Sequence, residues 1–223
     1  MPTATCKAVL LDIDGTLVDT NFLHVDAWLR ACADLGHPVD AWRVHRAIGM
    51  DSSKLLATLL DDDEERLGDA VKERHAIHYA ADQERMRRFA GAQELLRELA
   101  DRGLQVVLAT SAPQEEFDMI IAALDPGDSV SQVTTAEDVE EAKPAPDVIQ
   151  VALRKAGVTA DEAIMVGDAA WDAESSAAAG VRCIGVLSGG YGAAELRDAG
   201  AIAVYDDVAE LLRRLDDSPI FSR

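Results

Sequence analysis

The chain of 223 residues is poor in cysteine, in aromatic residues and in positive charge. Its three cysteines, Cys6, Cys32 and Cys183, are widely spaced, which argues against both a disulfide framework and a zinc site. With 21 basic against 41 acidic residues, the formal net charge is −20, and no basic stripe is present. We therefore expect no nucleic-acid partner. No window approaches the roughly 18 apolar residues of a transmembrane helix, so we also expect no membrane partner.

The remaining composition is that of a globular protein. Apolar residues make up 48% of the chain, enough for a buried core, and the length suits one large domain or a core with a smaller companion. The segment Met1–Lys7 lacks the pattern of a signal peptide, so we expect a cytoplasmic protein. The sequence leaves the oligomeric state, monomer or dimer, open.

Short β-branched runs recur along the chain and alternate, in its second part, with segments whose apolar residues have helical spacing. This alternation predicts an α/β fold, a Rossmann-like core in which helices cover both faces of a parallel sheet. The predicted strands are Ala8–Asp12, Gln105–Thr110, Val130–Thr135, Ala163–Gly167, Arg182–Leu187 and Ala201–Tyr205.

The interval between Asp19 and about Phe89 breaks this alternation, because it contains no strand-like run. Apolar residues step at helical spacing from Val25 to Leu35, and a long charged helix is predicted from about Glu65 to Arg87. About 70 residues are too many for an ordinary crossover. We therefore predict an all-helical cap domain, perched over the carboxyl end of the first strand. The predicted domains are a core of residues 1–18 and 88–223 and a cap of residues 19–87.

Two carboxylates stand two residues apart at the end of the first strand, in the motif Asp12-Ile13-Asp14-Gly15-Thr16. At this spacing they project to the same side of the chain, and like charges so close raise each other's proton affinity. Strands are depleted in Asp, so the pair predicts a cation between the two side chains. The arrangement suits a divalent metal and a nucleophilic carboxylate.

Polar residues also follow the next three predicted strands. In an open parallel sheet, ligands bind beyond the carboxyl ends of the strands, so these residues are expected to converge on one rim. Carboxylates, hydroxyls and one ammonium can together bind Mg²⁺ and a phosphoryl group. The residues are Thr110 and Ser111 after the second strand, Lys143 in Lys143-Pro144-Ala145-Pro146-Asp147 beyond the third, and Asp168 with Asp172 after the fourth.

These motifs, in this order, resemble those of the haloacid dehalogenase superfamily. They are most similar to its magnesium-dependent phosphatase branch with a helical cap inserted after the first motif, the group of phosphoglycolate phosphatases and β-phosphoglucomutases. Asp12–Thr16 is similar to the first motif, Thr110 to the second, Lys143 to the third and Asp168 to Asp172 to the fourth. The resemblance covers nearly the whole chain. Ala169 departs from it, because the family often has Ser or Thr there, and the missing hydroxyl would weaken a hydrogen bond around the site.

The resemblance implies a role for each motif residue. Asp12 would be the nucleophile that forms an aspartyl-phosphate, and Asp14 the acid and base that protonates the leaving oxygen and then activates water. Mg²⁺ would be the cofactor, held by Asp12, by Asp168 and by the backbone carbonyl of Asp14.

The remaining motif residues would act on the phosphate and around the metal. Thr110, the backbone N–H of Ser111 and Lys143 would bind the phosphate, and Asp172 would lie in the outer shell of the metal, orienting water or Lys143.

In similar capped enzymes, residues that read the substrate lie on the cap loop facing the core, here Arg46–Lys54. Within this loop Arg46, Gly49 and Lys54 are the candidates for substrate specificity. The implied partner is a small phosphorylated metabolite, phosphoglycolate-like or a sugar phosphate, and the implied activity is phosphoric monoester hydrolysis.

Three alternatives stay open. A phosphonoacetaldehyde hydrolase on the same scaffold would need a cap lysine for a Schiff base, and Lys54 lies near the right loop. A hexose-phosphate mutase would interconvert isomers without net release of phosphate. A non-catalytic phosphate-binding module would bind Mg²⁺ and phosphate without turnover.

Overall fold

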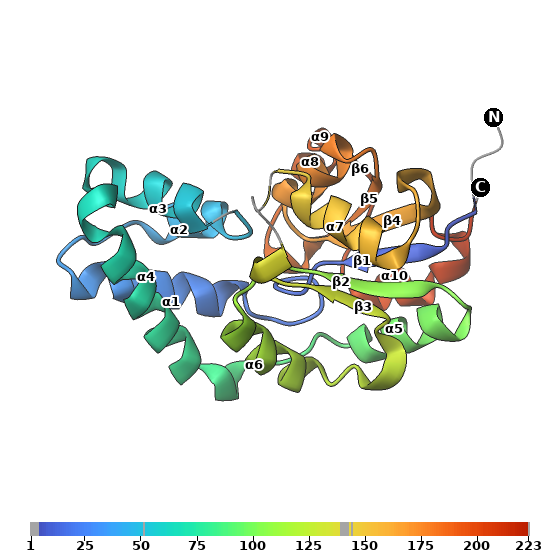
Figure 1. The fold of residues 1–223 in the computed structure, drawn as a ribbon, viewed down its shortest axis with the longest axis horizontal. Coiled ribbons are helices and arrows are strands. Elements are labelled where there is room, and N and C mark those ends of the chain that lie inside the picture. The colour runs from blue at the N-terminus through green and yellow to red at the C-terminus, as the bar shows by residue number, and fades with distance from the viewer. Residues whose placement is uncertain (1–4, 51, 139–142, 144, 223) are drawn as a thin grey trace.

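The computed structural model describes residues 5–50, 52–138, 143 and 145–222. Its centre is a six-stranded, wholly parallel sheet with the order β3-β2-β1-β4-β5-β6 (Figure 1). The predicted parallel α/β fold is confirmed, and each predicted strand is found to within one or two residues. The strands are β1 (Ala8–Leu11), β2 (Gln105–Ala109), β3 (Gln132–Thr134), β4 (Ala163–Gly167), β5 (Arg182–Val186) and β6 (Ala201–Tyr205).

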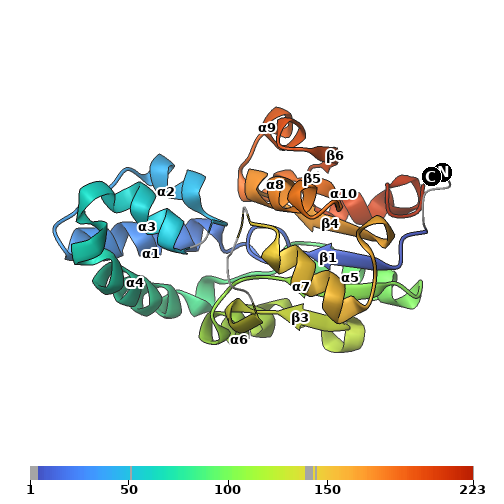
Figure 2. The same ribbon diagram turned by 45° about the horizontal axis from the view of Figure 1, so that its top comes forward.

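Helices cover both faces of this sheet, because alternate strand residues point to opposite sides. Val9 and Leu11 belong to one apolar core, shared with α5, α6 and α10, while Ala8 and Leu10 belong to the other, shared with α7 and α8. Figure 2 shows α7 and α8 on the side turned toward the viewer. The core helices are α5 (Ala92–Asp101), α6 (Gln114–Leu124), α7 (Asp147–Ala156), α8 (Ala170–Ala178), α9 (Ala193–Asp198) and α10 (Val208–Arg213).

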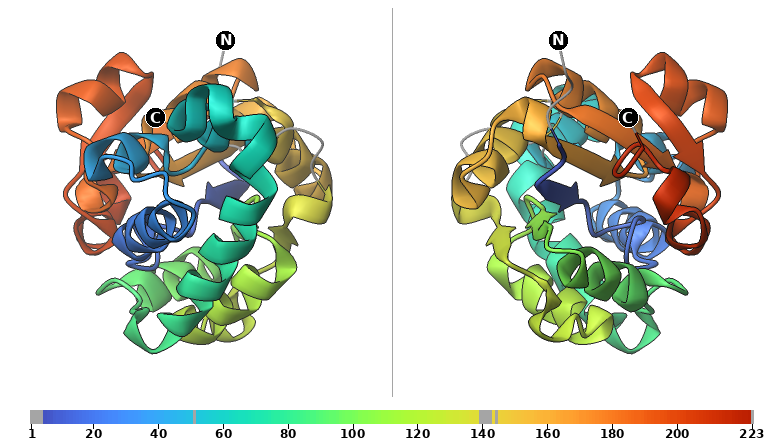
Figure 3. Two further views of the ribbon diagram at one scale, coloured as in Figure 1. Left: turned by 90° about the vertical axis from the view of Figure 1, so that its left-hand side faces the viewer. Right: turned by 90° about the vertical axis from the view of Figure 1, so that its right-hand side faces the viewer.

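The chain between β1 and α5 folds into four helices that lie beyond the carboxyl ends of the strands (Figure 1). The left view of Figure 3 looks onto these helices, with the sheet behind them. They enclose an apolar core of their own, in which Trp28, Val44, Leu59 and Val71 are buried. The helices, called the inserted helices below, are α1 (Asn21–Asp34), α2 (Ala41–Ala47), α3 (Ser52–Leu60) and α4 (Glu64–Ala81).

The long charged helix is shorter than predicted. It ends at Ala81 rather than near Arg87, and a single 3-10 turn, Gln83–Arg85, follows it. Met86 is 3% exposed and belongs to the same apolar core as Val9 and Leu11. The chain leaves the helix before Met86 because this side chain is buried in that core. Helical periodicity alone did not show that the burial of Met86 redirects the backbone.

The chain leaves the core for the inserted helices and returns from them at adjacent points. Val18 forms an antiparallel bridge with Arg88. The N–H of Asp19 donates to the carbonyl of Arg87 (2.8 Å), and the N–H of Phe89 donates to that of Leu17 (2.9 Å). Two paired segments therefore connect the inserted helices to the sheet. Among the described residues, no helix combines the length and the apolar character needed to cross a membrane.

Candidate active site

The first motif forms a tight turn at the centre of the rim. Asp12 directly follows β1 and is 8% exposed, and its N–H donates to the carbonyl of Val166 in β4 (2.9 Å). Gly15 has φ +75°, and a Cβ atom there would lie 2.2 Å from Nδ2 of Asn21 and 2.5 Å from Oδ2 of Asp168. Both the backbone conformation and the close approach therefore require glycine.

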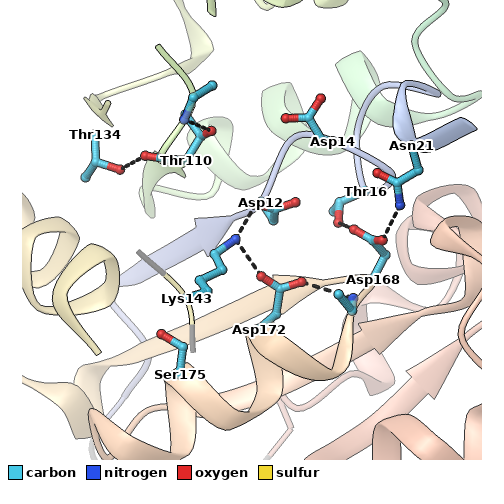
Figure 4. A network of polar contacts seen from close by, with 12 residues as sticks. Asp12, Asp14, Thr16, Asn21, Thr110, Thr134, Lys143, Asp168, Asp172 and Ser175 are labelled. Atoms are coloured by element: carbon cyan, nitrogen blue, oxygen red, sulfur yellow. Dashed lines mark hydrogen bonds and ion pairs between the residues drawn. The ribbon is translucent and has the colours of Figure 1, made fainter. Parts of the chain in front are cut away.

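Lys143 connects two carboxylates that are far apart in the sequence (Figure 4). Its Nζ atom lies 2.5 Å from Oδ1 of Asp12 and 2.6 Å from Oδ1 of Asp172, and its side chain is almost wholly buried. The other oxygen of Asp172 accepts from the N–H of Ala169 (3.0 Å), so the start of α8 fixes this carboxylate. Asp172 thus holds the ammonium group against Asp12.

Asp168 follows β4 and is held by two donors from the segment after β1. Thr16 Oγ1 donates to Oδ1 (2.7 Å), and Asn21 Nδ2 donates to Oδ2 (2.9 Å). On its other side the loop after β5 approaches so closely that a Cβ atom at Gly189 would lie 1.7 Å from Oδ2. These contacts leave Asp168 1% exposed and fixed in orientation.

Oxygen atoms of Asp12, Asp168 and Asp172 lie within 4.8 Å of one another. Burial raises the pKa of Asp12 well above its usual value, despite the opposing charge of Lys143. Burial, together with the charge of Asp172, raises the pKa of Asp168 to about 7. The charge of one lysine does not compensate three buried carboxylates. Carboxylate oxygens are the ligands that Mg²⁺ prefers, so Asp12 and Asp168 fit a magnesium ion, while Asp172 beside them is engaged by Lys143 and Ala169.

Thr110 and Ser111 follow β2 and line the same cavity as the acidic residues. The Oγ1 atom of Thr110 accepts from the N–H of Ala112 (3.0 Å), and its backbone carbonyl accepts from Thr134 Oγ1 (2.8 Å). Because its oxygen already accepts, the hydroxyl of Thr110 is oriented as a donor. A donor of this kind suits a phosphate oxygen.

Asp14 differs from Asp12 in its surroundings. Its Oδ1 atom accepts from Thr20 Oγ1 (2.5 Å) and lies 3.5 Å from Nε2 of His24 in α1. Burial opposes the ionised form, but His24 and Thr20 outweigh it and lower the pKa of Asp14. The pKa of His24 is raised in turn, because Asp14 outweighs the opposing effect of burial. Asp14 is therefore paired with an imidazole, whereas Asp12 is paired with an ammonium group.

A cavity of about 320 Å³ lies between the rim of the sheet and the inserted helices. The rim supplies the first-motif carboxylates, Thr110, Ser111, Lys143, Asp168 and Asp172. The inserted helices supply apolar wall residues, among them Trp28, Ile48 and Leu55, and polar groups such as Lys72. The site can thus hold a compact molecule against the carboxylates.

A model of the haloacid dehalogenase-like hydrolases matches residues 9–186, a stretch that contains this entire rim. The chain belongs to that family.

The chain is 33% identical over 216 residues to a phosphoglycolate phosphatase of Rhodospirillum rubrum, covering 92% of this chain and 89% of that protein. A solved structure of a hydrolase from Pseudomonas syringae has 34% identity and a TM-score of 0.89, covering 95% of this chain and 98% of that one. A putative β-phosphoglucomutase from Bacteroides vulgatus superposes with a TM-score of 0.85 at 21% identity, over 96% and 89% of the two chains. That last likeness shows the fold alone.

In this haloacid dehalogenase-like hydrolase, the three predicted specificity residues are placed differently. Gly49 lines the cavity, but neither Arg46 nor Lys54 is among the described residues that do. Arg46 forms an ion pair with Glu195 and lies over the ring of Tyr191, so it contacts the loop and helix after β5. Lys54 is exposed on α3.

Several residues around the site carried no recognisable signal in the sequence. Asn21 orients Asp168 together with Thr16 of the first motif, His24 contacts Asp14, and His75 and Glu116 lie behind His24. The histidines have no metal-ligand spacing, and the contacts of His24 with the other elements depend on how helices pack. Only the position of Asn21 and His24, shortly after the first motif, could have marked them as neighbours of the site.

Proposed function

We propose that this hydrolase is a magnesium-dependent phosphomonoesterase that cleaves a small phosphorylated metabolite through an aspartyl-phosphate. The observation that carries the proposal is the contact of Lys143 with Asp12 beside two further buried carboxylates, at a cavity lined by Thr110. This arrangement offers a nucleophile, a phosphate site and a metal site together. The name of the Rhodospirillum rubrum relative supports the same activity.

Asp12 attacks phosphorus, and the bond from phosphorus to the leaving oxygen breaks. An ionised Asp12 needs no base to attack, and the charge of Lys143 favours this form against the burial that raises the pKa of Asp12. Lys143, with Thr110 and the N–H of Ser111, holds the phosphate oxygens. Asp12, Asp168 and the carbonyl of Asp14 would hold Mg²⁺, which would supply positive charge that offsets the repulsion between nucleophile and phosphate.

Asp14 moves the protons. In its protonated form Asp14 gives its proton to the leaving oxygen, and the carboxylate that remains takes one from the water that cleaves the aspartyl-phosphate, which regenerates Asp12 and releases phosphate. The inserted helices, taken as the cap domain of residues 19–87, would exclude bulk water from the core of residues 1–18 and 88–223 during these steps.

The cavity volume supports a compact substrate, phosphoglycolate or a sugar phosphate. Phosphoglycolate is the first compound to test, because it gives the Rhodospirillum rubrum relative its name. Lys72, a cation of α4 that lines the cavity, is placed to attract an anionic leaving group. The rival phosphonoacetaldehyde hydrolase gains no support from Lys54, which is exposed and is not among the described residues that line the cavity.

The test is a screen of phosphorylated metabolites for released inorganic phosphate, with Mg²⁺ and with EDTA. We expect release that requires Mg²⁺ and that Asp12→Asn abolishes while the circular dichroism spectrum stays unchanged. Asp19→Asn is the matched control, because Asp19 is an exposed carboxylate of the same segment and should keep full activity. Isomerisation without release would identify a mutase, and binding without turnover would identify a non-catalytic module.

A further inference from the structure

Four titratable side chains form a row that starts at Asp14 and crosses the cavity wall. His24 Nε2 lies 3.5 Å from Oδ1 of Asp14, and His24 Nδ1 lies 3.1 Å from Nε2 of His75. His75 Nδ1 lies 3.8 Å from Oε1 of Glu116. The row joins the turn after β1, α1, α4 and α6, so it runs through two inserted helices and ends on a core helix.

Aromatic rings fix the two imidazoles in this row. The ring of His75 stacks on Trp28, and the ring of His24 stacks on Tyr79, each at 3.9 Å between centroids and nearly parallel. His75 is 4% exposed and Tyr79 is fully buried. These stacks fix the plane of each imidazole, and the contacts with Asp14 and Glu116 and between the two rings give the direction of its nitrogens.

The partners assign the hydrogens of the row. An ionised Asp14 only accepts, so Nε2 of His24 carries a hydrogen toward it. Burial, with a smaller effect of His24, lowers the pKa of His75 to about 2, so His75 is neutral and has one N–H. When His24 is an imidazolium, both of its nitrogens donate, so Nε2 of His75 accepts and the hydrogen of His75 lies on Nδ1, facing Glu116.

We propose that His75 and Glu116 are positioning residues for Asp14 that act through His24, an inference that rests on the proposed phosphatase function. Glu116 keeps the hydrogen of His75 on Nδ1, and His75 then accepts from His24. His24 in turn keeps its Nε2–H aimed at Asp14. Neither His75 nor Glu116 touches Asp14, and the row is complete only while α4 lies against α6. The orientation of the acid therefore depends on the seating of the inserted helices.

The test exploits the leaving group. Asp14 must protonate a strongly basic leaving oxygen, whereas nitrophenolate departs without a proton. We measure kcat and KM with Mg²⁺ for phenyl phosphate and for p-nitrophenyl phosphate, two substrates of nearly the same shape. His75→Gln and Glu116→Gln should lower kcat for phenyl phosphate about tenfold more than for p-nitrophenyl phosphate, with KM unchanged. General acid catalysis commonly contributes a rate factor of ~10²–10⁴, so the loss of a group that only positions the acid should cost a fraction of it.

His78→Gln is the matched control, because His78 is on the same helix but bonds to Asp34 outside the cavity. It should leave both rates unchanged. Equal losses on the two substrates in His75→Gln and Glu116→Gln would overturn the positioning role and leave the proposed function standing. Absence of phosphate release from the unaltered protein on both substrates would overturn the proposed function, and the positioning role with it.

A second measurement keeps the inference testable if His75→Gln fails to fold. In protein labelled with ¹⁵N at histidine, Glu116→Gln should shift the ring nitrogen resonances of His24, which Glu116 does not touch. Unchanged His24 resonances in that variant would overturn the inference.

Discussion

The contact between Lys143 and its two carboxylates yields the most demanding prediction. Lys143→Met keeps the length and apolar stem of the side chain but removes the charge that Asp12 and Asp172 share. The lysine is 4% exposed, and although burial opposes its charge, the two carboxylates outweigh that effect and raise its pKa. The ammonium group is therefore ionised at neutral pH.

Removing one partner of a buried ion pair leaves an uncompensated charge and costs about 3–5 kcal/mol. For a chain of this size, each kcal/mol shifts the melting temperature by roughly 2–4 °C. We therefore expect Lys143→Met to lower the melting temperature by roughly 6–20 °C without metal. Lys155→Met is the control, because Lys155 pairs with Asp138 at a partly exposed site and should cost about 0–1 kcal/mol.

The assay is a double-mutant cycle followed by urea unfolding in EDTA. Asp172→Asn keeps an oxygen that can accept from Ala169 while it removes one of the unpaired charges. Lys143→Met combined with Asp172→Asn should therefore be more stable than the sum of the two single losses predicts, by about 1–3 kcal/mol. Additive losses, or a cost of Lys143→Met no larger than that of Lys155→Met, would refute the reasoning.

Three further predictions concern the same rim. Because the folded-state pKa of Asp168 is raised to about 7, the metal-free protein binds an extra proton when folded, so its free energy of unfolding should fall as the pH rises from about 4 to about 7. Mg²⁺ should accordingly raise the melting temperature more at pH 8 than at pH 5, and an equal rise would contradict this. Thr110→Val removes a phosphate donor and should lower kcat by ~10²-fold with an unchanged circular dichroism spectrum; near-normal turnover would exclude the role. Gly15→Ala should lower the free energy of unfolding by more than about 1 kcal/mol, because its Cβ atom meets Asn21 and its φ is positive; unaltered urea unfolding would count against the required turn.

The sheet and its rim could be predicted from the sequence because local rules determine them. Buried parallel strands are short β-branched runs, and connections between them place every strand's carboxyl end on one side. Four such runs are followed by Asp12, Thr110, Lys143 and Asp168. The parallel topology alone therefore predicts that these side chains lie around one cavity. No pattern shows the hydrogen bond from Ser175 to the carbonyl of Ala145, two residues after Lys143.

The inserted helices could be predicted as helices, but their contacts with the rim could not. Periodicity shows which face of α4 is apolar, yet it does not show that His75 meets His24 of α1 and Glu116 of α6. Such contacts between side chains depend on the crossing angles of the helices and on where each helix ends. Both vary with the side chains at each contact. The same limit applies to Arg46, whose partner Glu195 is 149 residues away in the sequence.

The paired segments around Val18 and Arg88 have a consequence for how this enzyme type diversifies. The chain leaves the core near Val18 and returns to it near Arg88, and these two points are adjacent. Another helical insert could therefore replace the segment between them with almost no change in the distance between its two ends. The residues that would transfer phosphate lie almost entirely outside that interval. The cavity-lining residues that would select the leaving group of the substrate lie within it. An exchanged insert that keeps Asn21 and His24, which contact Asp168 and Asp14, could therefore bring a new substrate preference to the same reaction centre.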